Sequence, residues 1–141
     1  EGRVDMIMET CLALAIYFEA RSEPIAGQLA VAQVIENRVA SRHYPDNICE
    51  VVMEGPVYKS GHPKRNMCQF SFWCDGKPET INDNDAWQTA LRIAKSVKDI
   101  DVSEGATHYH SIDVSPAWRY TMQTTVVIGR HIFYKPTGEG K

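Results

Sequence analysis

The sequence predicts an α+β fold, with helices in the first two thirds of the chain and a small antiparallel sheet near its C-terminus. Apolar residues recur at helical spacing as far as residue 98, and after residue 106 the pattern changes to short strands. Helices followed by such a sheet are typical of this class. The 141 residues suffice for one domain with a hydrophobic core, so we expect a single domain over 1–141 with its core at about residues 5–135.

Two long helices are expected first, the first of them over about Asp5 to Ala20. The chain then breaks at a Ser-Glu-Pro sequence, where Ser22 suits the N-cap of a second helix and the Glu and Pro suit its first turn. This helix extends to about Ser41. A wide apolar stripe predicts that it is central and mostly covered, and the stripe consists of Ile25, Leu29, Val31, Ala32, Val34, Ile35 and Val39.

Shorter elements follow along the chain. We expect a short helix at Asn47–Met53, an exposed loop at Gly55–Met67 and a helix at Asp83–Lys98. A short strand is predicted at Ala106–His110. Residues 120–134 predict a β-hairpin with glycine in its turn, and a loose tail begins at residue 136.

Composition excludes several classes of protein. Hydrophobic residues make up 43% and charged residues 23%, which is ordinary for a globular domain. The net charge of −3 gives no support for nucleic-acid binding driven by bulk charge. No apolar run is long enough to span a bilayer. The chain begins with Glu1 and not with Met, which fits a mature or trimmed chain.

Four cysteines, an even number in a small domain, allow two disulfides and therefore an exported protein. Spacing does not choose among the three pairings, although Cys68 and Cys74 flank one short loop and are the favoured pair. The alternative is free buried thiols, for which Cys11 is the best candidate. A zinc site is disfavoured, because no pair has the short spacing of a zinc knuckle.

Glu19 interrupts the apolar stripe of the first predicted helix. Helical steps back from this residue meet Ile16, Ala15, Leu12, Cys11 and Met8. Burial of an ionised carboxylate is costly, so we expect either a structural partner or a carboxyl group that keeps its proton. Apolar neighbours raise the pKa of a carboxyl group, and a protonated Glu is the general acid that a glycosidic oxygen needs.

A structural role is the alternative for Glu19, either in an ion pair with Arg21 or Arg38 or as a cap for a backbone group, and spacing alone favours it. Three side chains are candidates for a second catalytic carboxylate: Glu23, Asp75 and Asp113. The sequence does not choose among them and so does not distinguish retaining from inverting hydrolysis. Glu23 equally suits a charge at a helix N-terminus.

Aromatic and polar side chains occur together in the loops and strands. The aromatic ones are Phe70, Phe72, Trp73, Tyr109, Trp118 and Tyr120, and the polar ones are Gln69, Ser71 and His110. Sugar rings stack their C–H faces on aromatic rings, and their hydroxyl groups bond to amides and hydroxyls. The pattern therefore indicates a carbohydrate site, with an ordinary aromatic core as the alternative.

A histidine pair suggests a rival, metal-dependent chemistry. In a strand, His108 and His110 face the same way. Together with His43, His62 or His131 and an acid they would form a zinc site. A single H-x-H is a weak signal and no H-E-x-x-H occurs, so we expect no metal.

Several segments in order resemble the SleB/CwlJ type of cell wall hydrolase, the spore-cortex-lytic family. They are Leu12–Pro24, Gly27–Val39, Cys68–Gly76, Ala106–His110, Pro116–Trp118 and Ile128–Tyr134. The Cys68–Gly76 segment resembles the version found outside spore formers. The family has Gly-Glu-Ala-Arg-Gly-Glu around its catalytic acid. Here Phe18 and Ser22 replace the two glycines, whereas both glutamates remain.

The resemblance implies a lysozyme-like helical domain that cuts peptidoglycan between N-acetylmuramic acid and N-acetylglucosamine. It implies that Glu19 is the catalytic residue and that no cofactor is needed. We expect a lytic transglycosylase that forms 1,6-anhydro products, because one acid is clear and no partner is. A muramidase with the same acid is the alternative, followed by a metal-dependent peptidoglycan amidase or peptidase and a glycan-binding module without turnover.

Further residues are predicted to shape the site or to contact the glycan strand. Glu23 is assigned to site architecture. Polar contacts are expected from Gln69, Ser71, Tyr109 and His110, and stacking from Phe70, Trp73 and Trp118. We expect a monomer that binds glycan strands, without nucleic acid or a membrane span. The cysteines and the wall substrate favour the cell envelope, the periplasm or secretion, with a phage lysin that acts on the wall as the alternative.

Overall fold

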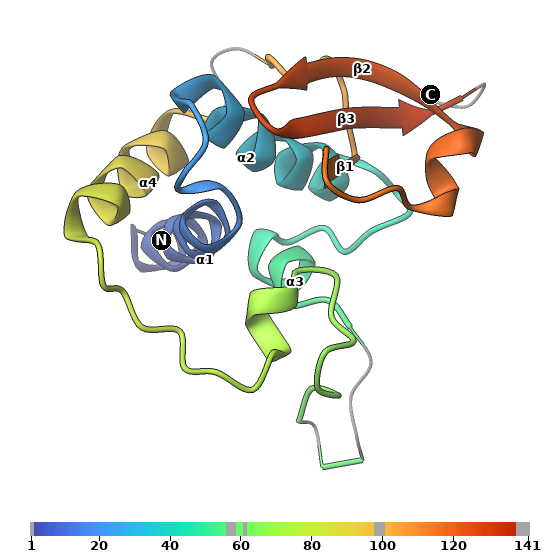
Figure 1. Cartoon of the computed structure of the whole chain (residues 1–141). Helices are drawn as coiled ribbons and strands as arrows, with labels where there is room; N and C mark the ends of the chain where they lie inside the picture. Colours follow the sequence, from blue (N-terminus) through green and yellow to red (C-terminus); the bar gives the residue numbers. More distant parts are fainter. Residues whose placement is uncertain (1, 56–58, 61, 98–100, 138–141) are drawn as a thin grey trace.

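The structure is a computed structural model and describes residues 2–55, 59–60, 62–97 and 101–137 (Figure 1). Within this part of the chain four α-helices precede a three-stranded sheet: α1 (Gly2–Ala20), α2 (Ile25–Ala40), α3 (Ile48–Val52), α4 (Asn84–Ser96), β1 (His108–Ser111), β2 (Met122–Ile128) and β3 (His131–Pro136). Two 3-10 helices lie among them: η1 (Ser71–Cys74) and η2 (Ala117–Thr121). The predicted α+β class is confirmed.

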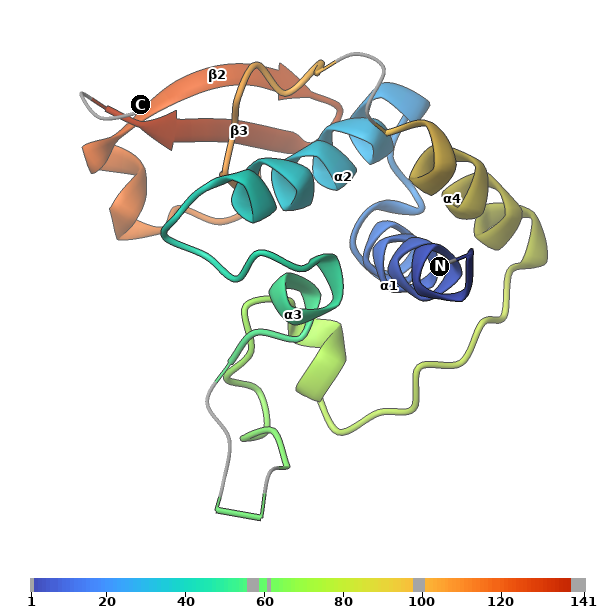
Figure 2. The same ribbon diagram turned by 180° about the vertical axis from the view of Figure 1, so that it is seen from behind.

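Helix α2 lies between the sheet and the other helices (Figures 1 and 2). Ala32 and Ile35 belong to the core cluster shared with α1 and α4. Val31 and Val34 belong to a second cluster that includes Phe133 of β3. This confirms the predicted central helix. Of the predicted stripe, Ile25, the first residue of the helix, is 58% exposed.

The start of α2 differs from the prediction. The helix begins at Ile25 and follows Pro24, so Ser22 is not its N-cap. Glu23 also lies outside the helix, and its Oε1 accepts a hydrogen bond of 2.9 Å from the backbone N–H of Arg130. The N-cap position is occupied by Pro24 without a side-chain cap, and the Glu23 carboxylate bonds across the molecule.

The remaining helices begin and end close to the predicted positions. The side chain of Asn47 caps α3, and that of Asp83 caps α4 by accepting a hydrogen bond from the backbone N–H of Ala86. The predicted end of the last helix, Lys98, and the tail at 138–141 lie outside the described residues. Tyr120 belongs to η2 and not to the first strand of the hairpin.

The sheet is antiparallel with the order β1-β3-β2. The predicted hairpin is formed by β2 and β3, which turn at Gly129 with φ 58°. Tyr109 of β1 pairs with Phe133 of β3. Because side chains alternate along a strand, Tyr109 projects from one face of β1, and His108 and His110 project from the other.

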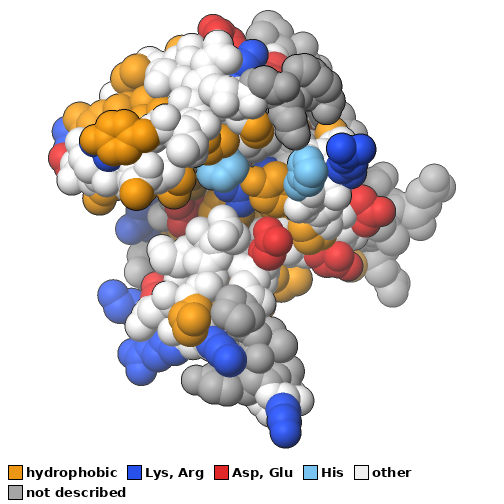
Figure 3. Space-filling model, turned by 90° about the vertical axis from the view of Figure 1, so that its right-hand side faces the viewer, with side chains coloured by type: hydrophobic (Ala, Val, Ile, Leu, Met, Phe, Trp, Pro, Cys, Tyr) orange, Lys and Arg blue, Asp and Glu red, His pale blue; other side chains and the backbone are white. Residues whose placement is uncertain are grey.

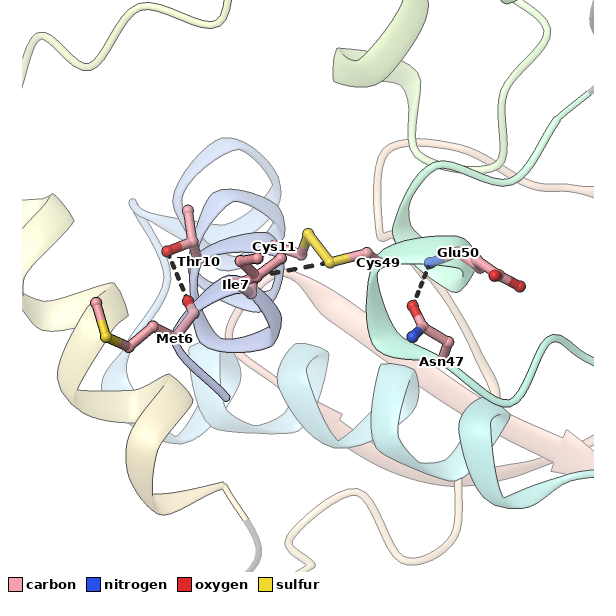
Figure 4. The surroundings of a disulfide bond; sticks show 7 residues. All are labelled: Met6, Ile7, Thr10, Cys11, Asn47, Cys49 and Glu50. Atoms are coloured by element: carbon pink, nitrogen blue, oxygen red, sulfur yellow. Dashed lines mark hydrogen bonds between the residues drawn. A yellow bond between two sulfur atoms is a disulfide. The ribbon is translucent and has the colours of Figure 1, made fainter. Parts of the chain in front are cut away.

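Two disulfides connect the elements. Cys11 of α1 bonds to Cys49 of α3 (Figure 4). Cys68 bonds to Cys74 across the short loop that contains η1, as favoured from the sequence. The alternative of a free thiol at Cys11 is wrong. None of the described helices has the length and apolar character needed to cross a membrane.

The two disulfides should differ in their contribution to stability. Cys11–Cys49 closes a sequence separation of 38 residues and Cys68–Cys74 one of 6. Loop-closure entropy predicts about 4 kcal/mol for the first and about 2 kcal/mol for the second. Replacing both cysteines of each pair with alanine and measuring urea unfolding tests this order. An equal loss from both pairs would contradict it.

Candidate active site

Glu19 lies in the last turn of α1. Leu12 and Ile16, which precede it on the same apolar stripe of the helix, are buried. Its Oε1 accepts a hydrogen bond of 2.7 Å from the hydroxyl of Tyr109, a residue 90 positions away on β1. No ion pair involves Glu19 in the described part of the chain.

The two arginines considered as structural partners of Glu19 are engaged elsewhere. The guanidinium of Arg21 lies 4.6 Å from the centre of the Tyr17 ring. Arg38 donates from Nε to the carbonyl of Thr107 at 2.8 Å. The ion-pair interpretation of Glu19 is therefore wrong.

Burial raises the pKa of Glu19, and the hydrogen bond from Tyr109 opposes this rise in part. The pKa of Tyr109 is held well above its usual value, first by burial and then by the charge of Glu19, so the phenol keeps its proton. A phenol that donates to Oε1 leaves Oε2 as the oxygen that carries the proton of a neutral Glu19. This arrangement suits a general acid whose ionised form is also stabilised.

Tyr109 is held in place by the sheet. Its ring lies 4.9 Å from that of His131 and 5.7 Å from that of Phe133, measured between ring centres. Both partners belong to β3, the strand that pairs with β1. The sheet therefore sets the position of the hydroxyl that contacts Glu19.

Glu23 fastens the hairpin turn to the loop between α1 and α2. Besides the bond from Arg130, its backbone carbonyl accepts a hydrogen bond of 3.0 Å from Nε2 of Gln28. The turn residue Gly129 lies against this loop, where an added Cβ would meet Oε1 of Glu23 and, at 2.8 Å, Cδ of Pro24. These contacts agree with the assignment of Glu23 to the architecture of the site.

The other candidate carboxylates also have partners away from Glu19. Asp113 forms an exposed ion pair with Arg130, with 2.6 Å between Oδ2 and Nη2. Asp75 accepts a hydrogen bond from the backbone N–H of Lys77. No hydrogen bond joins any of the three candidates to Glu19 among the described residues.

An aromatic cluster lies on the opposite face of β1 from Tyr109. His110 contacts the hydroxyl of Tyr134 through Nε2 at 2.8 Å. The Trp118 ring lies 5.1 Å from that of His108 and 5.7 Å from that of His110. Burial, aided by the charge of Arg38, lowers the pKa of His108 to about 4, so its imidazole is neutral at physiological pH.

No group of three or more His, Cys, Asp or Glu side chains within the described ranges is arranged to hold a metal ion. His108 and His110 do face the same way, as expected. Their ring nitrogens, however, contact the hydroxyls of Thr107 and Tyr134 and the carbonyl of Ser111. The geometry thus gives no support to the zinc alternative.

The loop closed by Cys68–Cys74 supplies the other predicted contacts. Gln69 and Ser71 are exposed, and Trp73 is half-buried. Phe70 is 3% exposed and His110 is 8% exposed. Because Phe70 packs beneath Arg38 and His110 is bonded to Tyr134, the predicted stacking on Phe70 and the predicted polar contact through His110 are disfavoured.

Figure 3 shows that the molecule is hollowed on one face, between the sheet above and the α3–η1 region below. Histidine, basic and hydrophobic side chains gather in this hollow, with acidic ones at its border. Phe72 of η1 stacks on Phe18, with 5.0 Å between ring centres, and this contact brings the disulfide loop to the end of α1 beside Glu19.

Sequence reasoning missed Arg38 as a site residue, although it had the means to find it. Helical steps back from Arg38 meet Ile35, Val34 and Val31, so it continues a buried stripe just as Glu19 does. The ring contact between His131 and Tyr109 could not be predicted in this way, because no local sequence pattern indicates it.

Residues 22–134 match the model of the cell wall hydrolase family, and the chain belongs to this family. The matched stretch begins three residues after Glu19. Among curated relatives, the spore cortex-lytic enzyme of Halalkalibacterium halodurans is 35% identical over 123 residues, and that of Bacillus subtilis is 32% identical over 123 residues. Both alignments cover 86% of this chain, which spans about a third of the relatives' length (33% and 35%).

Solved structures support the fold over nearly the whole chain. The catalytic domain of the germination-specific lytic transglycosylase SleB from Bacillus anthracis matches with a TM-score of 0.69 and 31% identity, covering 91% of this chain and 93% of that one. The catalytic domain of Bacillus cereus SleB matches with a TM-score of 0.65 and 28% identity, covering 94% and 91%.

Replacing Tyr109 with phenylalanine should raise the pKa of Glu19 further, because the hydrogen bond from the phenol favours the ionised carboxylate. An NMR titration that follows the side-chain carboxyl carbon of Glu19 measures this shift directly. Tyr120→Phe is the matched control, since Tyr120 is 77% exposed and is bonded to Arg119. A lower pKa in Tyr109→Phe would contradict the assigned contact.

Two glycine substitutions should separate backbone strain from crowding at the hairpin turn. Gly105 and Gly129 both have positive φ, but an added Cβ meets nothing within 4 Å at Gly105 and meets the Pro24 ring at Gly129. Gly105→Ala should cost about 1–2 kcal/mol of unfolding free energy for the left-handed backbone alone. Gly129→Ala should cost clearly more in the same urea titration. Equal losses would mean that the contact with Pro24 and Glu23 does not matter.

Proposed function

We propose that this chain is a lytic transglycosylase that cuts peptidoglycan glycan strands between N-acetylmuramic acid and N-acetylglucosamine. The observation that carries the proposal is the half-buried carboxyl group of Glu19, which has a raised pKa and a phenol as its hydrogen-bond partner. Membership of the cell wall hydrolase family and the likeness to the SleB catalytic domain support the substrate class and the reaction.

In the proposed mechanism Glu19 acts first as an acid. It transfers its proton to the glycosidic oxygen, the bond from this oxygen to C1 of the muramic acid breaks, and positive charge develops on that sugar ring. The electron pair of the broken bond stays with the protonated leaving group. Tyr109 donates to the carboxylate that forms, so the negative charge created in a buried place has a fixed partner.

Glu19 then acts as a base. The carboxylate takes the proton from the C6 hydroxyl of the same muramic acid, and O6 bonds to C1. This gives a 1,6-anhydro product and returns Glu19 to its protonated form. The cycle needs no water as nucleophile and no second carboxylate, which agrees with the separate partners of Glu23, Asp75 and Asp113.

The remaining assignments are part of the same proposal. Gln69 and Ser71 are exposed and Trp73 and Trp118 are partly exposed, so these four remain the candidate contacts for the sugar chain. We further propose that the protein acts as a monomeric single domain in the cell envelope or outside the cell. Two disulfides support such a location.

The decisive experiment is mass spectrometry of the fragments released from purified peptidoglycan sacculi. The unaltered protein should release anhydro-muropeptides, and Glu19→Gln should reduce their release by at least about 100-fold, because the amide is too weak an acid to protonate the glycosidic oxygen. Glu50→Gln on α3 is the matched control and should keep full activity. Reducing muropeptides as the main product would favour the muramidase, and cut peptides or full activity in Glu19→Gln would overturn the proposal.

A thermal unfolding measurement shows whether Glu19→Gln loses chemistry or structure. Because burial raises the pKa of Glu19, its ionisation at higher pH weakens the native state. Protonated Glu19 makes its full contribution to the free energy of unfolding below the ordinary pKa of 4.5. This contribution is lost as the pH rises through the pKa of Glu19 in the native protein. Glu19→Gln should therefore melt at a higher temperature than the unaltered protein at neutral pH, and this gain should shrink towards pH 4.

A further inference from the structure

Arg38 is a buried arginine without an acidic partner. It lies in the last turn of α2 and is 5% exposed. The ion pair that the described residues contain joins Arg130 to Asp113, and no carboxylate of the described residues lies within ion-pair distance of Arg38. A guanidinium removed from water without a counter-charge carries a desolvation cost that a purely structural side chain would avoid.

The contacts of Arg38 are all with neutral groups. Nε donates to the carbonyl of Thr107 at 2.8 Å, and Nη1 donates to Oε1 of Gln69 at 3.3 Å. The guanidinium carbon lies 4.9 Å from the centre of the Tyr44 ring and 5.7 Å from that of Phe70. These groups orient the guanidinium without neutralising its charge.

Arg38 also keeps unused donors. A guanidinium has five N–H groups, and two of them make the hydrogen bonds described. Nη2 makes no hydrogen bond to the described residues. The described side-chain atoms that are sealed from solvent without a partner belong to Gln28, Glu54 and His131, so Nη2 is not one of the sealed atoms.

Arg38 connects two segments that lie far apart in the sequence. Gln69 belongs to the disulfide loop, and Thr107 immediately precedes β1. The charge of Arg38 acts on both His108 and Tyr109, which places the guanidinium next to the group that contacts Glu19. Glu19, the carboxyl group that Tyr109 contacts, forms no ion pair with Arg38 among the described residues.

We propose that Arg38 binds a carboxylate of the substrate through Nη2 and the remaining N–H of Nη1. This inference rests on the proposed function, because it assumes that a peptidoglycan strand lies in the hollow. A forked guanidinium is well suited to a planar carboxylate, and burial strengthens the pair. Peptidoglycan can present this group as the free lactyl carboxylate of a muramic acid without a stem peptide, or as a carboxylate of the stem peptide itself.

The test compares charged and neutral forms of two substrates. Glycan strands stripped of their peptides carry free lactyl carboxylates, and intact sacculi fragments carry those of the stems. Each is assayed before and after its carboxylates are converted to amides with a carbodiimide and ammonia. The measured quantity is the ratio of kcat/KM for the charged form to that for the amidated form, with anhydro-sugar release as the readout.

For the unaltered protein we expect this ratio to be at least about 10 with one of the two substrates, and that substrate identifies the source of the carboxylate. Arg38→Gln should bring the ratio close to 1. Arg38→Lys, which keeps the charge and loses the fork, should give an intermediate value. Arg42→Gln is the matched control, since Arg42 is exposed just beyond α2 and should leave the ratio unchanged.

Two results would overturn the inference. One is a ratio close to 1 for the unaltered protein with both substrates. The other is an unchanged ratio in Arg38→Gln and Arg38→Lys while kcat/KM falls equally for charged and amidated forms, which is the signature of a structural role. Should Arg38→Gln fail to fold, Arg38→Lys decides by the same ratio. Failure of the proposed function differs from both, because no substrate would then yield anhydro products.

Discussion

The hydrogen bond between Tyr109 and Glu19 is the interaction on which the rest of the candidate site depends. A carboxyl group in an apolar helix stripe resists ionisation, and a buried phenol is a donor that keeps its own proton. Together they make a carboxyl group that keeps its proton to a higher pH than a free one does and that tolerates the loss of this proton. The proposed double role of Glu19 as acid and base requires both properties.

Helix α2 makes this contact possible because it joins the helices to the sheet through buried polar side chains. Gln33 accepts a hydrogen bond from the backbone N–H of Ser103, and Asn37 donates to the carbonyl of Ala106. Arg38 donates to the carbonyl of Thr107. These bonds satisfy the backbone that leads into β1 and so hold Tyr109 over the end of α1. Apolar residues alone would bury the same surface without defining this register.

Much of the architecture follows from local sequence patterns. The helices, the hairpin and the Cys68–Cys74 pair could be predicted because periodicity, glycine in a turn and short loop closure act over a few residues. The start of α2 could not, because the helix follows Pro24 without a side-chain cap and Glu23 bonds to Arg130 across the molecule. The burial of Phe70 and His110 could not be predicted for a related reason, since exposure depends on packing partners that lie far away in the chain.

By itself the sequence determined that Glu19 stands out, because a carboxyl group within an apolar stripe is visible from helical spacing alone. Helical spacing likewise indicates that Arg38 interrupts a buried apolar stripe. Only the tertiary structure decided what each of them faces. The phenol that contacts Glu19 is 90 residues away, and the neutral partners of Arg38 lie 31 and 69 residues away. Local periodicity can show that a polar group is buried, but the groups that surround it are set by how distant segments pack.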